Sequence, residues 1–234
     1  MTTPGSHRDT YIEECHRNFF SNYALGIPPR QCGAVEKHIG GLVGMVPVLA
    51  WYAAHPEKAR SAALEHLALT HPGEKMAGAG GLVAELLLAV LNGRALKDAI
   101  LARIEAQDHP LVGHPFRKWL DDPDDWVIGP RLSTACYVEH SVPAVLYLAL
   151  KYHGDPEKAL VVNTNLGGDN AYRGGVLGAL LGAEHGRSGF PRRWVEGLRH
   201  PPAELAPPAA GRWLTPGRVT AGAAAGSVGP AGRS

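Results

Sequence analysis

The chain has 234 residues, of which 45% are hydrophobic and 7% aromatic, and 23 Lys and Arg nearly balance 22 Asp and Glu. This length suits one folded domain, with or without an appendage. A formal net charge of +1 gives no general attraction to nucleic acid or to an anionic membrane surface, so we expect neither as a partner. Many Ala and Leu beside few aromatic residues favour closely packed helices over a β-sandwich.

The cysteines and the hydropathy pattern predict where the protein resides. Cys15, Cys32 and Cys136 form an odd set without CxxC spacing, which indicates reduced thiols. Cys15 and His16 with Cys32 and His38 match no recognised zinc spacing, which argues against a zinc site. No segment approaches the roughly 18 apolar residues that cross a bilayer, and the N-terminus lacks the pattern of a secretory signal. We therefore expect a cytoplasmic protein.

Apolar residues recur at helical spacing, and no segment shows the alternation of a strand. The sequence therefore predicts an all-α fold, a single compact multi-helix orthogonal bundle. The predicted helices are Leu42–Ala54 with a kink at Pro47, Pro56–Leu69, Glu74–Leu91, Ala95–Ala106, Thr134–Tyr152 with Pro143 inside, Pro156–Val162, Tyr172–His185 and a further one within Phe190–Arg199.

Two segments depart from this pattern. The segment from Asp108 to Arg131 is rich in Pro and Asp, and it predicts a long excursion with at most one short helix, near Phe116–Leu120. Its acidic turn, with Asp121, Asp122, Asp124 and Asp125 around Pro123, is typical of a solvated loop. Residues 201–234 contain 21 Ala, Gly or Pro among 34 residues, so we expect a disordered tail after a helical domain at 1–200.

The sequence contains an internal similarity. HPEKA at residues 55–59 recurs as DPEKA at 155–159, and AGAGGLVAELLLA at 77–89 resembles AYRGGVLGALLGA at 171–183. The pattern predicts two helix–loop–helix units of similar design, in which the glycine pairs 80–81 and 174–175 permit close helix contact. The alternative is that both pentapeptides are a common helix start with proline in the first turn.

The most distinctive loop follows an apolar helix and reads NTNLGGDNAYRGG, residues 163–175. Gly167 and Gly168 permit backbone angles closed to other residues and expose N–H groups. The next helix presents its positive N-terminal end, which suits phosphate or carboxylate. Asp169 and the Asn side chains supply the oxygen ligands that Mg²⁺ prefers. The alternative is structural: a Gly-Gly helix end followed by Asp169 or Asn170 as the next helix cap.

At this loop the sequence resembles the signature of the ADP-ribosylglycohydrolase family, an Asn-rich stretch followed by Gly-Gly-Asp-x-Asp-Thr and a small-residue helix. HIGGLVGMVPVLAW at 38–51 resembles the family's glycine-rich turn before a helix that contains Met and Pro. LALTHPGEKMAGAGGLVAELLLA at 67–89 resembles its Thr-His loop. The three matches occur in the family's order and span most of residues 30–186.

The resemblance implies an all-helical hydrolase that removes ADP-ribose from modified proteins with the help of two metal ions, usually Mg²⁺ and alternatively Mn²⁺. It implies that Asp169 is a metal ligand and that ADP-ribose or an ADP-ribosylated protein is the partner. It also implies a substrate pocket bordered by His38, Gly40, Gly41, Asn165, Gly167 and Gly168. No catalytic residue is assigned. For His38 the alternative is an ordinary capping or core histidine.

The sequence departs from the family pattern at two places. The second Asp of the signature is Ala171 and the Thr is Tyr172, and residues 1–37 contain no Thr-Asp-Asp-Thr type of acidic motif. We therefore expect the chain to correspond to the C-terminal two-thirds or so of a family member, with weakened metal binding. Two classes of function follow: a metal-dependent hydrolase of a glycosidic bond to ADP-ribose, or a non-catalytic helical relative that binds ligand or partners.

Overall fold

The computed structural model describes residues 12–198. Within that range every regular element is a helix, as predicted, and two isolated bridges are the sole β-type pairings. None of the described helices is both long enough and apolar enough to cross a membrane. The expected tail at 201–234 lies outside the described residues.

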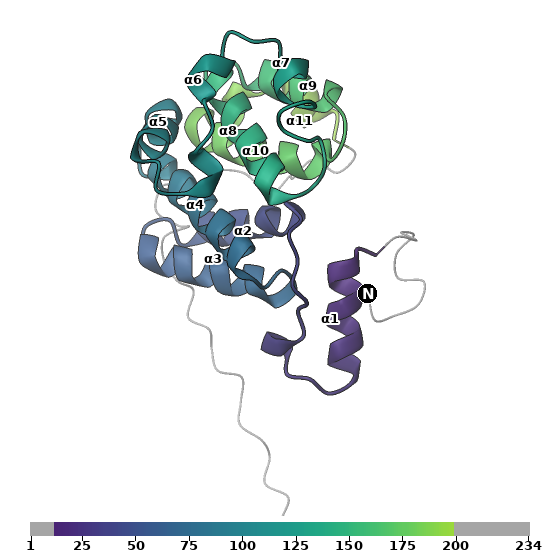
Figure 1. Cartoon of the computed structure of the whole chain (residues 1–234). Helices are drawn as coiled ribbons and strands as arrows, with labels where there is room; N and C mark the ends of the chain where they lie inside the picture. Colours follow the sequence, from purple (N-terminus) through teal and green to yellow (C-terminus); the bar gives the residue numbers. More distant parts are fainter. Residues whose placement is uncertain (1–11, 199–234) are drawn as a thin grey trace, which may run out of the picture.

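The elements follow one another along the chain as shown in Figure 1. The longer helices are α1 (Glu14–Ala24), α2 (Gly40–Trp51), α3 (Pro56–Thr70), α4 (Glu74–Leu91), α5 (Leu96–Ala106), α8 (Val138–Lys151), α9 (Pro156–Asn165) and α10 (Asn170–His185). Short helices are η1 (Pro29–Gln31), η2 (Pro110–Val112), α6 (Phe116–Trp119), α7 (Asp124–Val127), η3 (Arg187–Gly189) and α11 (Arg192–Glu196). Pro47 and Pro143 lie inside α2 and α8, as expected.

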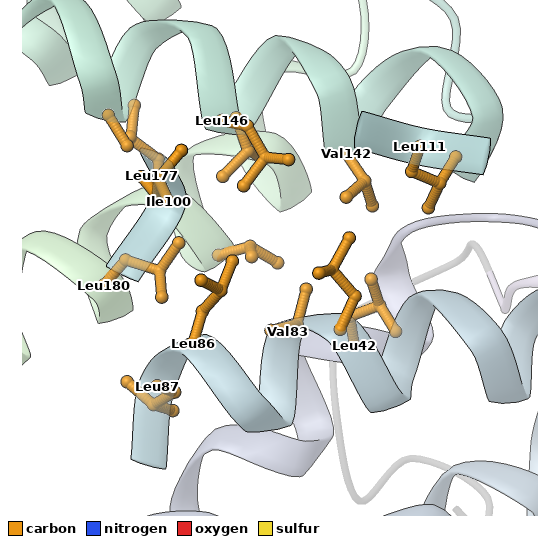
Figure 2. Packing of buried hydrophobic residues seen from close by; sticks show 14 of the residues in the cluster. Leu42, Val83, Leu86, Leu87, Ile100, Leu111, Val142, Leu146, Leu177 and Leu180 are labelled. Carbon is orange, nitrogen blue, oxygen red and sulfur yellow. The ribbon is translucent and has the colours of Figure 1, made fainter. Parts of the chain in front are cut away.

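Helix α10 holds the bundle together, because it packs against α2, α4, α8 and α9. Leucine and valine side chains from these helices meet in one continuous core, part of which is drawn in Figure 2. Val83 and Leu86 of α4 face Val142 and Leu146 of α8 there, with Leu177 from α10 beside them. Each of these five side chains is at most 2% exposed. Burying such a side chain contributes about 1.5–3 kcal/mol, so this core fixes how α10 sits.

The two predicted helix–loop–helix units are α3–α4 and α9–α10. Their helix starts share backbone angles, with φ −129° and ψ 77° at His55 and φ −139° and ψ 80° at Asp155. Small residues bring neighbouring helices close: a Cβ on Gly80 would lie 2.7 Å from Leu67, and one on Gly175 would lie 3.1 Å from Val43. A larger side chain at Gly80 would therefore separate α3 from α4.

Several predicted helix boundaries change, most of them by two or three residues. The helix expected from Thr134 begins at Val138, because the preceding residues form backbone hydrogen bonds to other loops, described below. Helix α1 was not predicted, and its few buried positions explain why: only Cys15 is fully buried. Near the C-terminus the predicted helix is shorter, at Arg192–Glu196.

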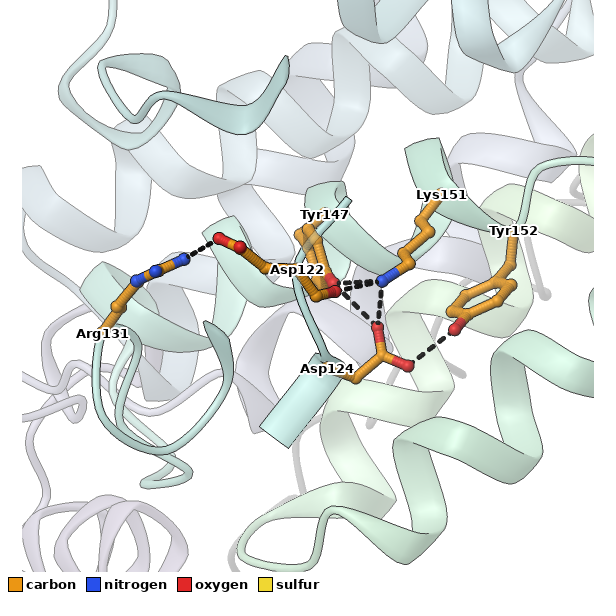
Figure 3. A network of polar contacts seen from close by, with 6 residues as sticks. All are labelled: Asp122, Asp124, Arg131, Tyr147, Lys151 and Tyr152. Carbon is orange, nitrogen blue, oxygen red and sulfur yellow. Dashed lines mark hydrogen bonds and ion pairs between the residues drawn. The ribbon is translucent and has the colours of Figure 1, made fainter. Parts of the chain in front are cut away.

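The excursion after α5 contains more structure than expected, since α6 and α7 are both helical. The prediction of a solvated acidic turn is wrong for Asp124, whose carboxylate accepts hydrogen bonds from Tyr147 at 2.7 Å and Tyr152 at 2.6 Å. Lys151 lies 3.0 Å from the same carboxylate (Figure 3). Burial raises the pKa of Asp124, but hydrogen bonds from the two tyrosines and Lys151 outweigh it, so the pKa is lowered overall. This network attaches α7 to α8.

Candidate functional site

The loop between α9 and α10 takes the conformation that its glycines predict. Gly167 has φ +69° and Gly168 has φ +64°, both in the left-handed region. Gly167 follows the C-cap residue of α9, and its N–H donates to the carbonyl of Thr164 at 3.2 Å. A Cβ on Gly168 would overlap the carbonyl of Thr134, whereas one on Gly167 would meet open space. Gly168 is therefore required by a close approach of two backbone segments as well as by its φ angle.

Asp169 occupies the N-cap position of α10, but its side chain makes no capping hydrogen bond. Its Oδ2 is buried and has no hydrogen-bond partner. Burial raises the pKa of Asp169, opposed by the N–H of Tyr172 and the charge of Arg173. An unpartnered buried carboxylate oxygen is costly. Oδ2 of Asp169 is therefore available to a cation, whereas the N–H of Tyr172, in the first turn of α10, also stabilises the ionised carboxylate.

We call residues 134–137 the connector. This segment links the loop at 167–169 to the segment at 38–51, which also resembles the family. The N–H of Asp169 donates to the carbonyl of Thr134 at 3.0 Å. Two residues further on, the carbonyl of Cys136 accepts from the N–H of Ile39 at 2.8 Å. Directly after the connector, the N–H of Val138 donates to the carbonyl of Lys37 at 2.9 Å. Both glycine loops are thus bonded to one short stretch of backbone.

The connector places the start of α2 beside the start of α10. A Cβ on Gly40, the first residue of α2, would lie 3.3 Å from the ring of Tyr172, in the first turn of α10. Gly41 approaches His71 even more closely, because a Cβ there would lie 2.7 Å from its Cγ. Two helix N-termini therefore meet at this point, and both present partial positive charge.

His38 lies at the edge of this region and has partners of its own. Its Nδ1 lies 2.8 Å from Oε1 of Glu36, and its ring stacks on Tyr137 with centroids 5.4 Å apart. The charge of His38 acts on Asp169 and lowers the pKa of that carboxyl, a smaller effect than burial. We use the term candidate site for Asp169, Tyr172, His38, Gly40 and Gly41.

Asn165, the last residue of α9, lies next to the candidate site rather than in it. It lines a neighbouring cavity of about 500 Å³ between α9 and the start of α10, together with Asn170, Ala171 and Trp194. Ala171, which replaces the family's second Asp, is exposed at that cavity. Asn165 thus lies at the end of α9 and faces a cavity that the start of α10 also lines.

Arg173 supports the loop, and the sequence analysis missed it. Its side chain is fully buried, its Nε donates to Oδ1 of Asn163 at 2.6 Å, and one of its terminal nitrogens donates to the carbonyls of Asn163 at 3.1 Å and Gly167 at 3.0 Å. Burial lowers the pKa of Arg173, and the nearby Asp169 acts in the opposite direction. An arginine in the first turn of a glycine-rich helix carries no sequence signal that distinguishes it from a solvated charge.

The residues fit one divalent cation better than two. Asp169 offers the buried, unpartnered oxygen that a cation would satisfy, and carboxylate oxygen is the donor that Mg²⁺ prefers. Alanine at 171 offers no donor. Tyr172 is a poor replacement, because burial and the neighbouring Glu13 raise its pKa to about 12 and keep the hydroxyl protonated.

The fold and the loop define a helical protein with an aspartate-bearing glycine turn beside two helix N-termini. The family model of ADP-ribosylglycohydrolase matches residues 3–224, and the chain belongs to this family, as its resemblance predicted. Among solved structures, a chain of an ADP-ribosylglycohydrolase-related protein complex is similar at 28% identity and a TM-score of 0.58. That match covers 80% of this chain and 63% of the other, so this chain spans less than two-thirds of that relative. No match is found among curated proteins.

Proposed function

We propose that the protein hydrolyses a glycosidic bond to ADP-ribose, with a divalent cation, Mg²⁺ or Mn²⁺, bound to Asp169. The observation that carries the proposal is the buried, unpartnered Oδ2 of Asp169 beside the contact between Gly40 and Tyr172. A cation ligand next to two helix N-termini suits a substrate that combines a ribose with a diphosphate. Family membership supports the reaction class.

Each residue of the candidate site has a role in this proposal. Asp169 holds the cation, and the left-handed turn at Gly167 and Gly168 presents its carboxylate. The N–H groups at the starts of α2 and α10 bind the diphosphate, and Gly40 lets the ring of Tyr172 pack closely against the start of α2. His38 borders the ribose side. A bound cation would polarise the ribose and supply an activated water. Asn165 lines the adjoining cavity together with Ala171 and is assigned to substrate binding.

The second candidate function is binding of ADP-ribose, or of an ADP-ribosylated protein, without hydrolysis. It is favoured by Ala171 and Tyr172, which leave Asp169 as the one carboxylate of the signature. Mg²⁺ gives up its hydration water reluctantly, so a site with one such carboxylate binds it weakly. The scaffold that would bind the diphosphate is retained in full under this alternative.

The deciding experiment measures release of ADP-ribose from ADP-ribosylated protein by the purified chain with Mg²⁺ or Mn²⁺. We expect release that requires the cation and falls at least tenfold in Asp169→Asn. Asp121→Asn, which removes an exposed carboxylate elsewhere, is the matched control and keeps full activity. Calorimetry with ADP-ribose accompanies the assay. Binding without release supports the second function, and neither binding nor release rejects both.

A further inference from the structure

A second group of metal-binding side chains lies at the start of α1. Glu13, Cys15 and His16 each direct one ligand atom into a space in which all three atoms lie within 4.8 Å of one another. The Sγ of Cys15 is 3.8 Å from Oε2 of Glu13 and 3.7 Å from Nδ1 of His16. Thiolate, imidazole and carboxylate are the three side-chain ligands that Zn²⁺ takes in proteins.

The distances match those between the ligands of one metal ion. With Zn–S near 2.3 Å and Zn–N near 2.0–2.1 Å, tetrahedral geometry places two ligand atoms about 3.5 Å apart. The measured separations from Cys15 to Glu13 and to His16 exceed this value by a few tenths of an ångström. The remaining separation, between Glu13 and His16, is at most 4.8 Å, so rotations of these two side chains bring all three atoms onto one ion.

Helix capping and core packing do not account for the arrangement, although Glu13 also accepts a hydrogen bond from the hydroxyl of Tyr172. Glu13 occupies the N-cap position of α1, yet its side chain makes no capping hydrogen bond. Cys15 is 3% exposed but is not part of the hydrophobic core cluster, and its sulfur instead contacts two polar atoms. A buried thiol that faces a carboxylate and an imidazole presents three donor types that a transition-metal ion can bind.

We propose that Glu13, Cys15 and His16 bind a transition-metal ion of the Zn²⁺ type, distinct from the cation assigned to Asp169. Three protein ligands leave the fourth tetrahedral position for water or for a substrate group, as in catalytic zinc sites. The site adjoins the candidate site, because the charge of Glu13 acts on both Asp169 and Tyr172. The zinc spacing tested in the sequence, Cys15 and His16 with Cys32 and His38, does not include Glu13, which is the third residue of the group.

Cobalt binding tests the proposal, because Co²⁺ occupies zinc sites and a thiolate ligand gives it a near-ultraviolet charge-transfer band. The full chain, reduced and freed of metal with a chelator, is titrated with Co²⁺. We expect a band that saturates at one equivalent and disappears when Zn²⁺ is added. Cys15→Ser removes the band, whereas Cys136→Ser, the matched control, retains it.

Two more variants keep the test decisive if Cys15→Ser folds poorly. His16→Ala leaves the thiol in place and should weaken Co²⁺ binding roughly tenfold or more. Asp169→Asn should leave the band unchanged, so this site and the proposed hydrolase are tested separately. The proposal is overturned if wild-type protein gives no saturable band, or if the band survives in Cys15→Ser and is lost in Cys136→Ser.

Discussion

The N–H of Asp169 donates to the carbonyl of Thr134, and the residue before it, Gly168, lies so close to Thr134 that no side chain fits between them. Asp169 and Thr134 are 35 positions apart in the sequence. Their contact holds the α9–α10 loop against the connector, and the connector in turn bonds to the residues that precede α2. The geometry of the candidate site therefore depends on this one approach of two backbones.

Substitution of the two loop glycines should have unequal effects. Gly167→Ala meets open space and costs only the left-handed backbone penalty, about 1–2 kcal/mol. Gly168→Ala has the same penalty and also forces Thr134 away, so we expect a loss of roughly 3 kcal/mol or more. Urea denaturation of both variants measures the difference. Equal losses would show that the contact with Thr134 does not constrain the loop.

Arg173→Met should destabilise the protein by roughly 3 kcal/mol or more, because it leaves the carbonyls of Asn163 and Gly167 buried without their donor. Arg187→Met, on the exposed η3, is the matched control and should change stability by no more than about 0.5 kcal/mol. Loss of the guanidinium should also raise the pKa of Asp169 further, which carboxyl NMR detects. A neutral effect of Arg173→Met on stability would contradict its role in the loop.

The raised pKa of Asp169 makes stability depend on pH in a definite direction. Without divalent cation, the folded state holds a proton on Asp169 more tightly than the unfolded state does, so wild-type stability falls as pH rises from about 3.9 through the raised folded value. Asp169→Asn removes this dependence and should be more stable than wild type at neutral pH. Thermal melts across this range measure it.

A divalent cation should reverse the order of stability of wild type and Asp169→Asn at neutral pH. Mg²⁺ or Mn²⁺ binds the ionised carboxylate, so either ion should raise the melting temperature of wild type at neutral pH and leave Asp169→Asn unchanged. The stabilisation should vanish as pH falls through the raised pKa of Asp169, at a higher pH than for an ordinary Asp. The same shift by cation in both proteins would place the ion elsewhere.

Restoring the family's missing carboxylate should strengthen cation binding. Ala171 is exposed in the first turn of α10, where a negative charge is favoured by the helix N-terminus. We expect Ala171→Asp to tighten Mg²⁺ binding about tenfold, or about 1.4 kcal/mol. Ala171→Asn, which has the same shape without the charge, is the control. Calorimetry gives both affinities, and an unchanged affinity in Ala171→Asp would mean that position 171 does not face the cation.

Asp124→Asn should destabilise the protein by about 1–3 kcal/mol at neutral pH, because Tyr147, Tyr152 and Lys151 lose their charged acceptor. Since the pKa of Asp124 is lowered by folding, its contribution is present above the ordinary pKa and is lost as pH falls through the folded value. Asp125→Asn, at the exposed neighbouring position, should have little effect. Guanidinium denaturation at two pH values checks both statements.

The sequence by itself determined the all-α fold, because helical spacing of apolar residues persists through residues that later pack into one core. It also determined the family, the two helix–loop–helix units and the turn at Gly167 and Gly168, since each depends on residues that are close together in the chain. Periodicity was least informative where a helix has little buried surface, which is why α1 and α7 were missed.

Tertiary structure decided which of the predicted site residues meet. The connector joins the Asp169 loop to Ile39, the residue before Gly40, through backbone hydrogen bonds. Nearly every residue carries the same backbone groups, so no sequence pattern predicts these bonds. Burial of charged side chains is not predicted by the sequence either. Arg173 and Asp124 have the sequence context of surface charges, and the packing of the helices decides that they are covered. The cavity that Asn165 lines with Asn170 and Ala171 likewise forms only when α9 and α10 pack together.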